Sequence, residues 1–145
     1  MLKGVDPRLG PDVLRALSAM GHGDVVVLCD ANFPAASVAA GTVTGLPLAM
    51  DNLTAAEAAE AVLSVLPLDT FEPEPACRMQ VGADPDAMPP VQAEVAALLD
   101  APPAPVERFA FYDLARGSFA VIVTGERRFY GCFAFRKGVI PPEAG

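Results

Sequence analysis

The chain has 145 residues, the usual size of one domain with one hydrophobic core. Its formal net charge is -8 and it has no Lys/Arg cluster, so little is available to neutralise phosphates and nucleic acid is not expected as a partner. Hydrophobic residues make up 52% of the sequence, yet no apolar run approaches the roughly 18 residues that a membrane span needs.

The first half of the chain predicts a helix, a buried strand, a loop and a short extended segment. Apolar residues at helical spacing after Pro11 predict a helix over 11–20. The β-branched run VVVLC at 25–29 predicts a strand buried on both faces. A loop is expected over 31–41, followed by a short strand within LPLAMDN at 46–52.

The middle of the chain combines clear helix signals with a proline-rich connection. Thr54 followed by Glu57 forms a capping-box pattern, which predicts a helix over 55–66. Spaced apolar residues predict another helix over 91–99. The sequence APPAP at 101–105 is too short for a domain linker and is expected to form a stiff loop.

Strands dominate the remaining predictions. CRMQV at 77–81 and SFAVIVTG at 118–125 are predicted strands, and 106–116 is a predicted helix. A last strand is expected over 127–135. Its alternation would place one set of side chains in the core, namely Phe129, Gly131, Phe133 and Phe135. It would leave the other set free to line a pocket, namely Tyr130, Cys132 and Ala134.

Helices interleave with strands throughout, which is typical of the α/β class. We predict one domain over 1–145, a three-layer α/β/α sandwich with a mostly parallel, mixed sheet. Much of the apolar excess is alanine, and we attribute it to an interface between subunits. The first 20 residues carry prolines and charges where a secretory signal needs an apolar core, so a cytoplasmic location is expected.

The three cysteines predict reduced thiols. Cys29, Cys77 and Cys132 are odd in number, lie far apart and form no C-x-x-C pair, so neither a disulfide framework nor a zinc site is expected. The chain has a single histidine, so no second one is available to activate Cys29 or Cys132 as a thiolate nucleophile. No nucleotide-binding glycine motif is present.

His22, the only histidine, lies between two glycines and is the leading candidate for acid/base chemistry. The ordinary pKa of histidine, about 6.5, lets it exchange protons near neutrality. The alternative is a side chain that interacts with the last carbonyls of the helix over 11–20, and the spacing alone does not decide between the two.

Other polar residues have both a functional and a structural interpretation. Asp30 ends the buried strand over 25–29, where α/β proteins gather ligands, although an aspartate there also caps the next element. Arg108 and Tyr112 are four residues apart on one helix face, which is most simply an exposed face. From the residues alone the chain has a cofactor-free acid/base site or a polar-ligand site.

Four separated blocks resemble one known family. They are MLKGVDPRLGPDVLRALSAMGHGD, DANFPA, RFAFYDLA and VIVTGERRFYGCFAFRKGV, and they occur in the family's order. Together they resemble the L-fucose mutarotase and D-ribose pyranase family, and the fucose branch more closely. The similarity runs from residue 1 to about 140 and is weakest between about 70 and 105.

The resemblance implies an isomerase that interconverts the anomers of L-fucose or a related aldose, without a metal or organic cofactor. It implies that His22 is the proton donor and that five residues contact the monosaccharide, namely Asp30, Arg108, Tyr130, Gly131 and Cys132. It also implies a ring-like homo-oligomer, a decamer. Two alternatives remain: pyranose–furanose interconversion of D-ribose, or a non-catalytic monosaccharide-binding module that accompanies sugar transport.

Two departures from the family pattern bear on the sugar. Cys132 stands where the family commonly has asparagine, and Asn32 and Ala36 stand where some fucose-type members have histidines. The spacing adds a geometric expectation. If 25–29 is a straight strand, His22 and Asp30 lie roughly 20 to 25 Å apart at about 3.3 Å per residue, so the segment bends or the two serve pockets shared between subunits.

Overall fold

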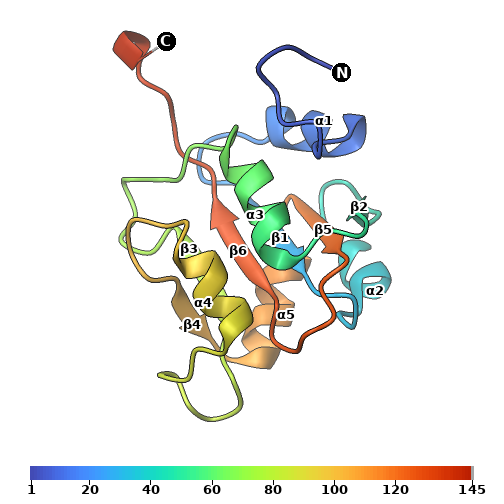
Figure 1. Ribbon diagram of the computed structural model, residues 1–145, viewed down its shortest axis with the longest axis vertical. Helices are drawn as coiled ribbons and strands as arrows, with labels where there is room; N and C mark the ends of the chain where they lie inside the picture. The colour runs from blue at the N-terminus through green and yellow to red at the C-terminus, as the bar shows by residue number, and fades with distance from the viewer. Residues whose placement is uncertain (145) are drawn as a thin grey trace.

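The computed structural model describes residues 1–144, in which a six-stranded sheet has the order β2-β5-β1-β6-β3-β4 and helices cover both of its faces (Figure 1). The strands are β1 (Val25–Cys29), β2 (Leu48–Met50), β3 (Ala76–Met79), β4 (Ala104–Val106), β5 (Ala120–Thr124) and β6 (Phe133–Arg136). The α-helices are α1 (Pro11–Ala19), α2 (Ala35–Ala39), α3 (Ala55–Leu63), α4 (Pro90–Ala96) and α5 (Arg108–Arg116), and a 3-10 turn spans Pro142–Ala144. The predicted α/β class is confirmed.

The sheet is mixed, with β6 running against the other strands. β1 pairs in parallel with β5 and antiparallel with β6, β2 pairs in parallel with β5, and β3 is antiparallel to β6 but parallel to β4. The carboxyl ends of β1, β3 and their parallel neighbours therefore meet at one edge of the sheet, together with the start of β6. Open α/β sheets bind ligands at such an edge.

β1 lies between two hydrophobic cores, which explains its unbroken apolar sequence. Val26 and Leu28 belong to the core under α1, α3 and α4, whereas Val27 and Cys29 belong to the core under α2 and α5. All four side chains are fully buried. This alternation is the geometry of a strand in the middle layer of three.

The capping box predicted the start of α3 correctly. Thr54 Oγ1 accepts the backbone N–H of Glu57, and the Glu57 carboxylate accepts the N–H of Thr54. The helix ends at Leu63, three residues before the predicted end, where the Ser64 hydroxyl bonds the carbonyl of Ala61. α4 likewise ends at Ala96 and not at 99.

Two segments expected to be loops contain regular structure. Residues 31–41 include α2, a five-residue helix too short for a periodic signal, whose Val38 and Ala39 are buried against β5 and α5. The 101–105 stretch leads into β4, where Pro105 pairs opposite Arg78. β4 is an edge strand, and a proline there removes no hydrogen bond from an inner ladder.

The predicted strand over 127–135 is wrong in its first half. β6 begins only at Phe133, and Tyr130 has a φ of +63°, a left-handed conformation that ends any strand alternation. Phe129 is therefore exposed and not in the core. Alternation holds from Cys132 onward, with Phe133 and Phe135 in one core and Cys132 and Ala134 in the other.

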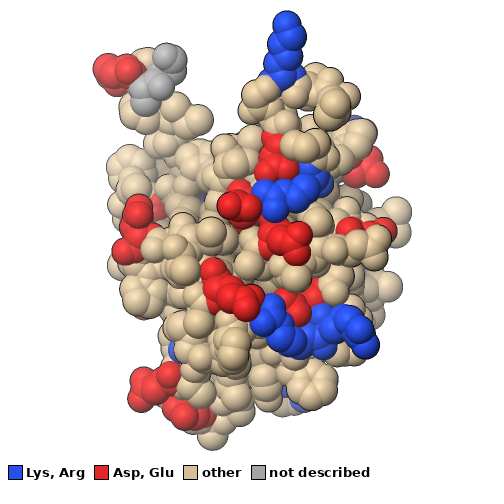
Figure 2. Space-filling model, viewed as in Figure 1, with Lys and Arg blue, Asp and Glu red and all other residues tan. Residues whose placement is uncertain are grey.

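The surface is acidic but not uniformly so. Figure 2 shows the basic side chains of this face in a few small groups, most of them beside acidic side chains. Two groups of ion pairs contribute to this pattern: Arg8 with Asp6 and Glu60, and Arg128 with Glu94 and Glu126. Among residues 1–144, no helix is long and apolar enough to cross a membrane.

Candidate functional site

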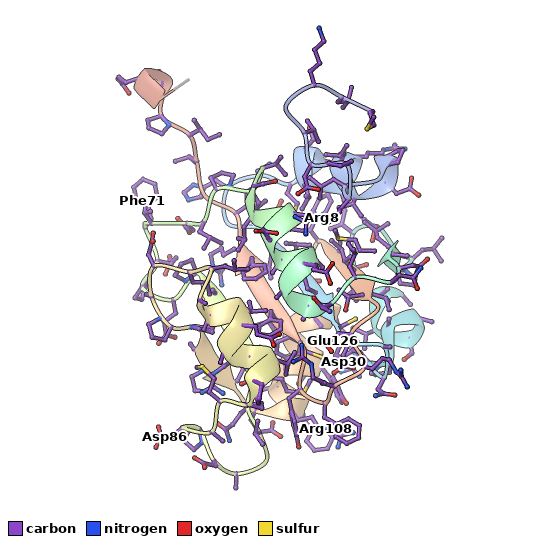
Figure 3. The ribbon with its side chains drawn as sticks, viewed as in Figure 1. Arg8, Asp30, Phe71, Asp86, Arg108 and Glu126 are labelled. Carbon is purple, nitrogen blue, oxygen red and sulfur yellow. The ribbon has the colours of Figure 1, made fainter. Side chains whose placement is uncertain are left out.

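A cavity of about 330 Å³ opens at the carboxyl-end edge of the sheet. Its lining comes from the segment after β1, the end of β3, one face of α5 and the turn before β6, namely Asp30, Asn32, Phe33, Met79, Arg108, Tyr112, Phe129, Tyr130 and Cys132. Figure 3 shows Asp30 and Arg108 in this part of the molecule. The volume lies at the small end of the range of ligand sites, roughly 300–1,000 Å³, and suits a small polar molecule.

Asp30 is the buried carboxylate of the cavity, with only 5% of its surface exposed. Its Oδ1 accepts the backbone N–H of Asn32 at 3.0 Å, and its Oδ2 accepts the N–H of Gly131 at 3.2 Å. The first bond is the local turn expected of an aspartate after a strand, whereas the second joins residues 101 positions apart. Asp30 therefore fixes the corner before β6 as well as facing the cavity.

That corner has an unusual backbone. Tyr130 is one of two non-glycine residues with positive φ in the described chain, a conformation that costs about 1 kcal/mol or more. Gly131 follows it, and a Cβ there would lie 2.8 Å from Glu126 Cγ and 3.4 Å from Asp30 Cβ. A side chain at 131 would therefore displace the carboxylate of Asp30 or the packing behind it.

Arg108 and Tyr112 form a pair on the first turns of α5. The Arg108 Nε donates to the Tyr112 hydroxyl at 2.9 Å, and the guanidinium lies 5.5 Å from the Tyr112 ring centroid. This hydrogen bond raises the pKa of Arg108 further above its usual range, so its charge is permanent. Glu107 caps the helix by accepting the N–H groups of Phe109 and Ala110. The pair faces the cavity with a fixed cation beside a phenol.

Cys132 contributes a thiol to the cavity and not a thiolate. Burial, and then the charge of Asp30, raises its pKa well above the usual range. Its Sγ lies 3.5 Å from Asp30 Oδ2, within reach of a weak S–H bond to the carboxylate. Burial likewise raises the pKa of Cys29, whose thiol bonds the carbonyl of Ile122. Neither cysteine is poised as a nucleophile.

His22 lies at the other end of β1, away from the cavity. Its Nε2 lies 3.1 Å from Asp69 Oδ1, and its ring packs 5.3 Å from that of Phe71. Because a carboxylate only accepts, His22 donates its Nε2–H to Asp69. The ring is 44% exposed. Figure 3 shows Phe71 and Asp30 at well-separated places in the molecule.

The alternative interpretation of His22, as the partner of the last carbonyls of α1, is wrong. Lys137 Nζ takes that place, donating to Leu17 O at 2.7 Å and to Met20 O at 2.6 Å. A cation at a helix C-terminus also complements the helix dipole. His22 is thereby left free of any capping role.

Asp69 is the residue that sequence reasoning missed. It is 3% exposed, and its Oδ1 accepts the N–H of Phe71 at 3.0 Å in addition to the His22 bond. The Phe71 bond, and then His22, hold the pKa of Asp69 below its usual range, so it stays ionised. Asp69 follows the segment PL at 67–68, in a stretch without helical or strand periodicity. Only its contact with His22, 47 positions away, indicates a role for it.

The structure thus divides the six predicted site residues into two groups. Asp30, Arg108, Tyr130 and Cys132 line one cavity, with Gly131 directly behind it, bonded to Asp30. His22 lies at the other end of β1, in contact with Asp69. Within residues 1–144, no group of three or more His, Cys, Asp or Glu side chains is arranged to hold a metal ion.

Comparisons with known proteins find relatives that match nearly the whole chain. Fucose mutarotase of Homo sapiens is 42% identical over 147 residues, which cover 96% of this chain and 94% of that protein. The crystal structure of protein Atu2016 is 53% identical with a TM-score of 0.95, covering 97% of both chains. Fucose mutarotase of Streptococcus pneumoniae, solved in complex with L-fucose, is 29% identical with a TM-score of 0.85, covering 97% of this chain and 100% of that one. Residues 3–140 match the model of one family, and the chain belongs to that family, the RbsD / FucU transport protein family.

Proposed function

We propose that this chain is a sugar mutarotase that interconverts the α and β anomers of L-fucose or a related aldose. The observation that carries the proposal is the cavity at the carboxyl end of β1, where a buried carboxylate, a permanent cation and two phenols face one small space. Such a set matches the hydroxyls of a monosaccharide. The human and pneumococcal relatives are named fucose mutarotases, which supports the same reaction here.

The reaction needs only proton transfer and positioning, so no cofactor enters the proposal. The ring oxygen gains a proton while the anomeric hydroxyl loses one, the bond between the anomeric carbon and the ring oxygen breaks, and the free aldehyde rotates before the ring closes on its other face. A positioned histidine typically accelerates such steps by about 10²- to 10⁴-fold. We assign His22 Nδ1 to give the proton to the ring oxygen and to take it back on closure.

The substrate contacts belong to the cavity. Asp30 accepts sugar hydroxyls, and Arg108 donates to them from the opposite wall. Tyr130 offers its hydroxyl and its ring face, and the Gly131–Cys132 backbone shapes the floor. The thiol of Cys132 presents a weaker donor than a side-chain amide would, so this position bears on which sugar is preferred.

His22 and the cavity are at opposite ends of β1, so we propose that they meet between two chains. Exposed apolar residues mark both ends: Phe71, Val139 and Ile140 near His22, and Phe109 and Phe129 near the cavity. When one end of a chain contacts the different end of the next, the chains form a closed ring if the rotation between neighbours adds up to a full turn. A ring-like homo-oligomer, a decamer, would place His22 of one chain at the cavity of the next.

We place the protein in the cytoplasm. All three cysteines are free thiols, and two of them are fully buried without forming a disulfide. Proteins in oxidising compartments commonly pair such residues, so reduced cysteines favour a reducing compartment.

Exchange spectroscopy by NMR on free sugars tests the proposal. Wild-type protein at micromolar concentration should accelerate α–β exchange of L-fucose well above the rate in buffer, with D-ribose, L-rhamnose and D-galactose as the comparison panel. Acceleration of pyranose–furanose exchange of D-ribose alone would identify a pyranase. Saturation-transfer signals from bound sugar without any acceleration would identify a binding module and contradict the mutarotase assignment.

A further inference from the structure

Two buried polar side chains outside the cavity hold the backbone corner at Tyr130 and Gly131 in place. They are Glu126, which is 3% exposed, and Gln92, which is fully buried. Neither lines the cavity, so neither contacts a ligand there. Glu126 lies close to Asp30 in the molecule (Figure 3), with Gly131 packed against both. Their contacts explain how a non-glycine residue keeps a left-handed conformation at this site.

Glu126 joins three segments of the chain. Its Oε1 accepts the backbone N–H of Ala55, at the start of α3, at 3.1 Å. Its Oε2 accepts both the backbone N–H and the Nε of Arg128, and its own carbonyl accepts the N–H of Ala31, next to Asp30. The Arg128 guanidinium, with these N–H groups, lowers the pKa of Glu126 to about 2, so the anchor remains charged at neutral pH.

Gln92 holds the same corner from α4. Its Nε2 donates to Tyr130 O at 3.0 Å and to Met79 O at 2.6 Å, so one amide ties two residues that line the cavity. Its Oε1 accepts Nη1 of the buried Arg78 at 3.0 Å. Arginine has only donors, which fixes which way the amide points. Removing the amide would leave the partly buried carbonyl of Tyr130 without this donor.

We propose that Glu126 and Gln92 are positioning residues that hold Tyr130 in its left-handed conformation and thereby set the affinity of the cavity for sugar. This inference rests on the mutarotase function proposed above. Both side chains act through Tyr130 and Gly131, because the carboxylate side chain of Glu126 fills the space where a Cβ at 131 would lie. Changes at Glu126 and Gln92 should alter the affinity for sugar and not the rate of proton transfer, since the proton donor His22 is at the other end of β1.

Steady-state NMR exchange kinetics of Glu126→Gln and Gln92→Met test the affinity claim. Each should raise KM for L-fucose about 5- to 20-fold, the equivalent of one or two buried hydrogen bonds, while kcat changes less than about twofold. In a Tyr130→Ala background the added effect of either change should vanish. An unchanged KM, or an equal effect in that background, would overturn the proposal.

Glu94→Gln is the matched control. It makes the same chemical change on the outer carboxylate that pairs with Arg128, at an exposed position that does not touch the corner. Its KM should stay at the wild-type value. Val95→Ala, which removes fully buried volume from α4, serves as the control for general destabilisation. If Val95→Ala raised KM as much as Gln92→Met, the positioning role would be wrong.

A spectroscopic measurement without sugar separates this inference from the proposed function. The chain has two tyrosines and no tryptophan, so in a Tyr112→Phe background Tyr130 is the sole strong intrinsic fluorophore. Gln92→Met and Glu126→Gln should increase acrylamide quenching of Tyr130, and Glu94→Gln should not. Increased quenching in a protein that does not accelerate anomer exchange would overturn the mutarotase function alone. Unchanged quenching in both variants would overturn the positioning role whatever the activity.

Discussion

The two ends of β1 are built differently. At the Asp30 end, side chains from four separate segments surround one cavity, and Asp30 itself is almost fully buried with both carboxylate oxygens bonded. At the His22 end, an imidazole that is 44% exposed makes one side-chain hydrogen bond, to Asp69, and packs at a tilt against the exposed ring of Phe71. One end encloses a cavity, and the other leaves a partly exposed imidazole at the surface.

The difference follows from the direction of the strands. β1 and β3 both end at the cavity edge, so their terminal residues and the turn into β6 converge there. At the opposite edge the chain enters β1 from the short connection after α1, which brings His22 against the segment before β3 and not against a pocket of its own. The two groups of predicted site residues are thus separated by the length of β1 within one chain.

The largest expected effect comes from the exposed end. His22→Ala should reduce kcat for anomer exchange by about 10²-fold or more, the typical contribution of a positioned general acid, while KM changes little because the cavity is untouched. NMR exchange rates and circular dichroism on the same samples measure both activity and folding. Catalysis at the wild-type rate by a folded His22→Ala protein would show that the general-acid assignment is wrong.

Mixing two inactive variants would test whether the two ends cooperate across chains. His22→Ala leaves the cavity intact, and Arg108→Ala leaves the histidine intact. In a randomly mixed ring, some neighbouring chains therefore combine an intact His22 from one chain with an intact cavity from the next. Such pairs amount to about a quarter of the sites when each site takes its halves from two chains. Unfolding and refolding the variants together should therefore restore about a quarter of wild-type activity.

The control is the same two variants refolded separately and then combined at low temperature, where subunits do not exchange. Activity should stay at the level of the parents. If co-refolded mixtures also stayed inactive, each site would draw both halves from a single chain, and the shared-site proposal would fail.

Sequence periodicity was sufficient for elements with strong local signals. VVVLC predicted β1, and Thr54 with Glu57 predicted the start of α3, because a doubly buried strand and a capping box are both local patterns. α2 and β4 were missed for the opposite reason. Five alanine-rich residues carry no periodic signal, and Pro105 is tolerated in a strand only because tertiary pairing places β4 at the sheet edge.

The candidate site was predictable only in part. Family resemblance named the residues that the structure gathers around the cavity, and the length of β1 already indicated that His22 lies far from Asp30. Asp69 could not be predicted, because its role depends on a contact with His22 across 47 positions. The left-handed Tyr130 was likewise missed, since only the tertiary supports from Glu126 and Gln92 make that backbone tolerable.

A smaller effect is expected from the partner of His22. Asp69→Asn keeps the shape of the side chain but removes the negative charge that lies beside the imidazole of His22, so kcat should fall about 10-fold with KM unchanged. The variant should also change acid stability. Because the pKa of Asp69 is lowered in the folded protein, its stabilising contribution is complete above the ordinary carboxyl range and is lost as the pH falls through the lowered value.

Urea unfolding at pH 7 and at pH 3 measures that second effect. Wild type should lose more stability between the two pH values than Asp69→Asn, which has no carboxyl to protonate at this position. Asp113→Asn is the control, since Asp113 is exposed on α5 and pairs only with Arg116. An equal loss in all three proteins would mean that the ionised Asp69 carboxylate, with its bonds to Phe71 and His22, contributes nothing to stability.

The smallest effect is expected within the cavity. Tyr112→Phe removes the hydroxyl that accepts from Arg108 Nε but keeps the ring over which the guanidinium lies. An exposed hydrogen bond of this kind is worth about 0.5 to 1 kcal/mol, so KM should rise only about two- to fivefold, and kcat should be unchanged. Arg108→Lys, which keeps the charge but loses the planar stack, should cost more. If Tyr112→Phe lowered kcat instead, the phenol would take part in proton transfer. The proposal that the cavity only binds the sugar while His22 transfers the proton would then be wrong.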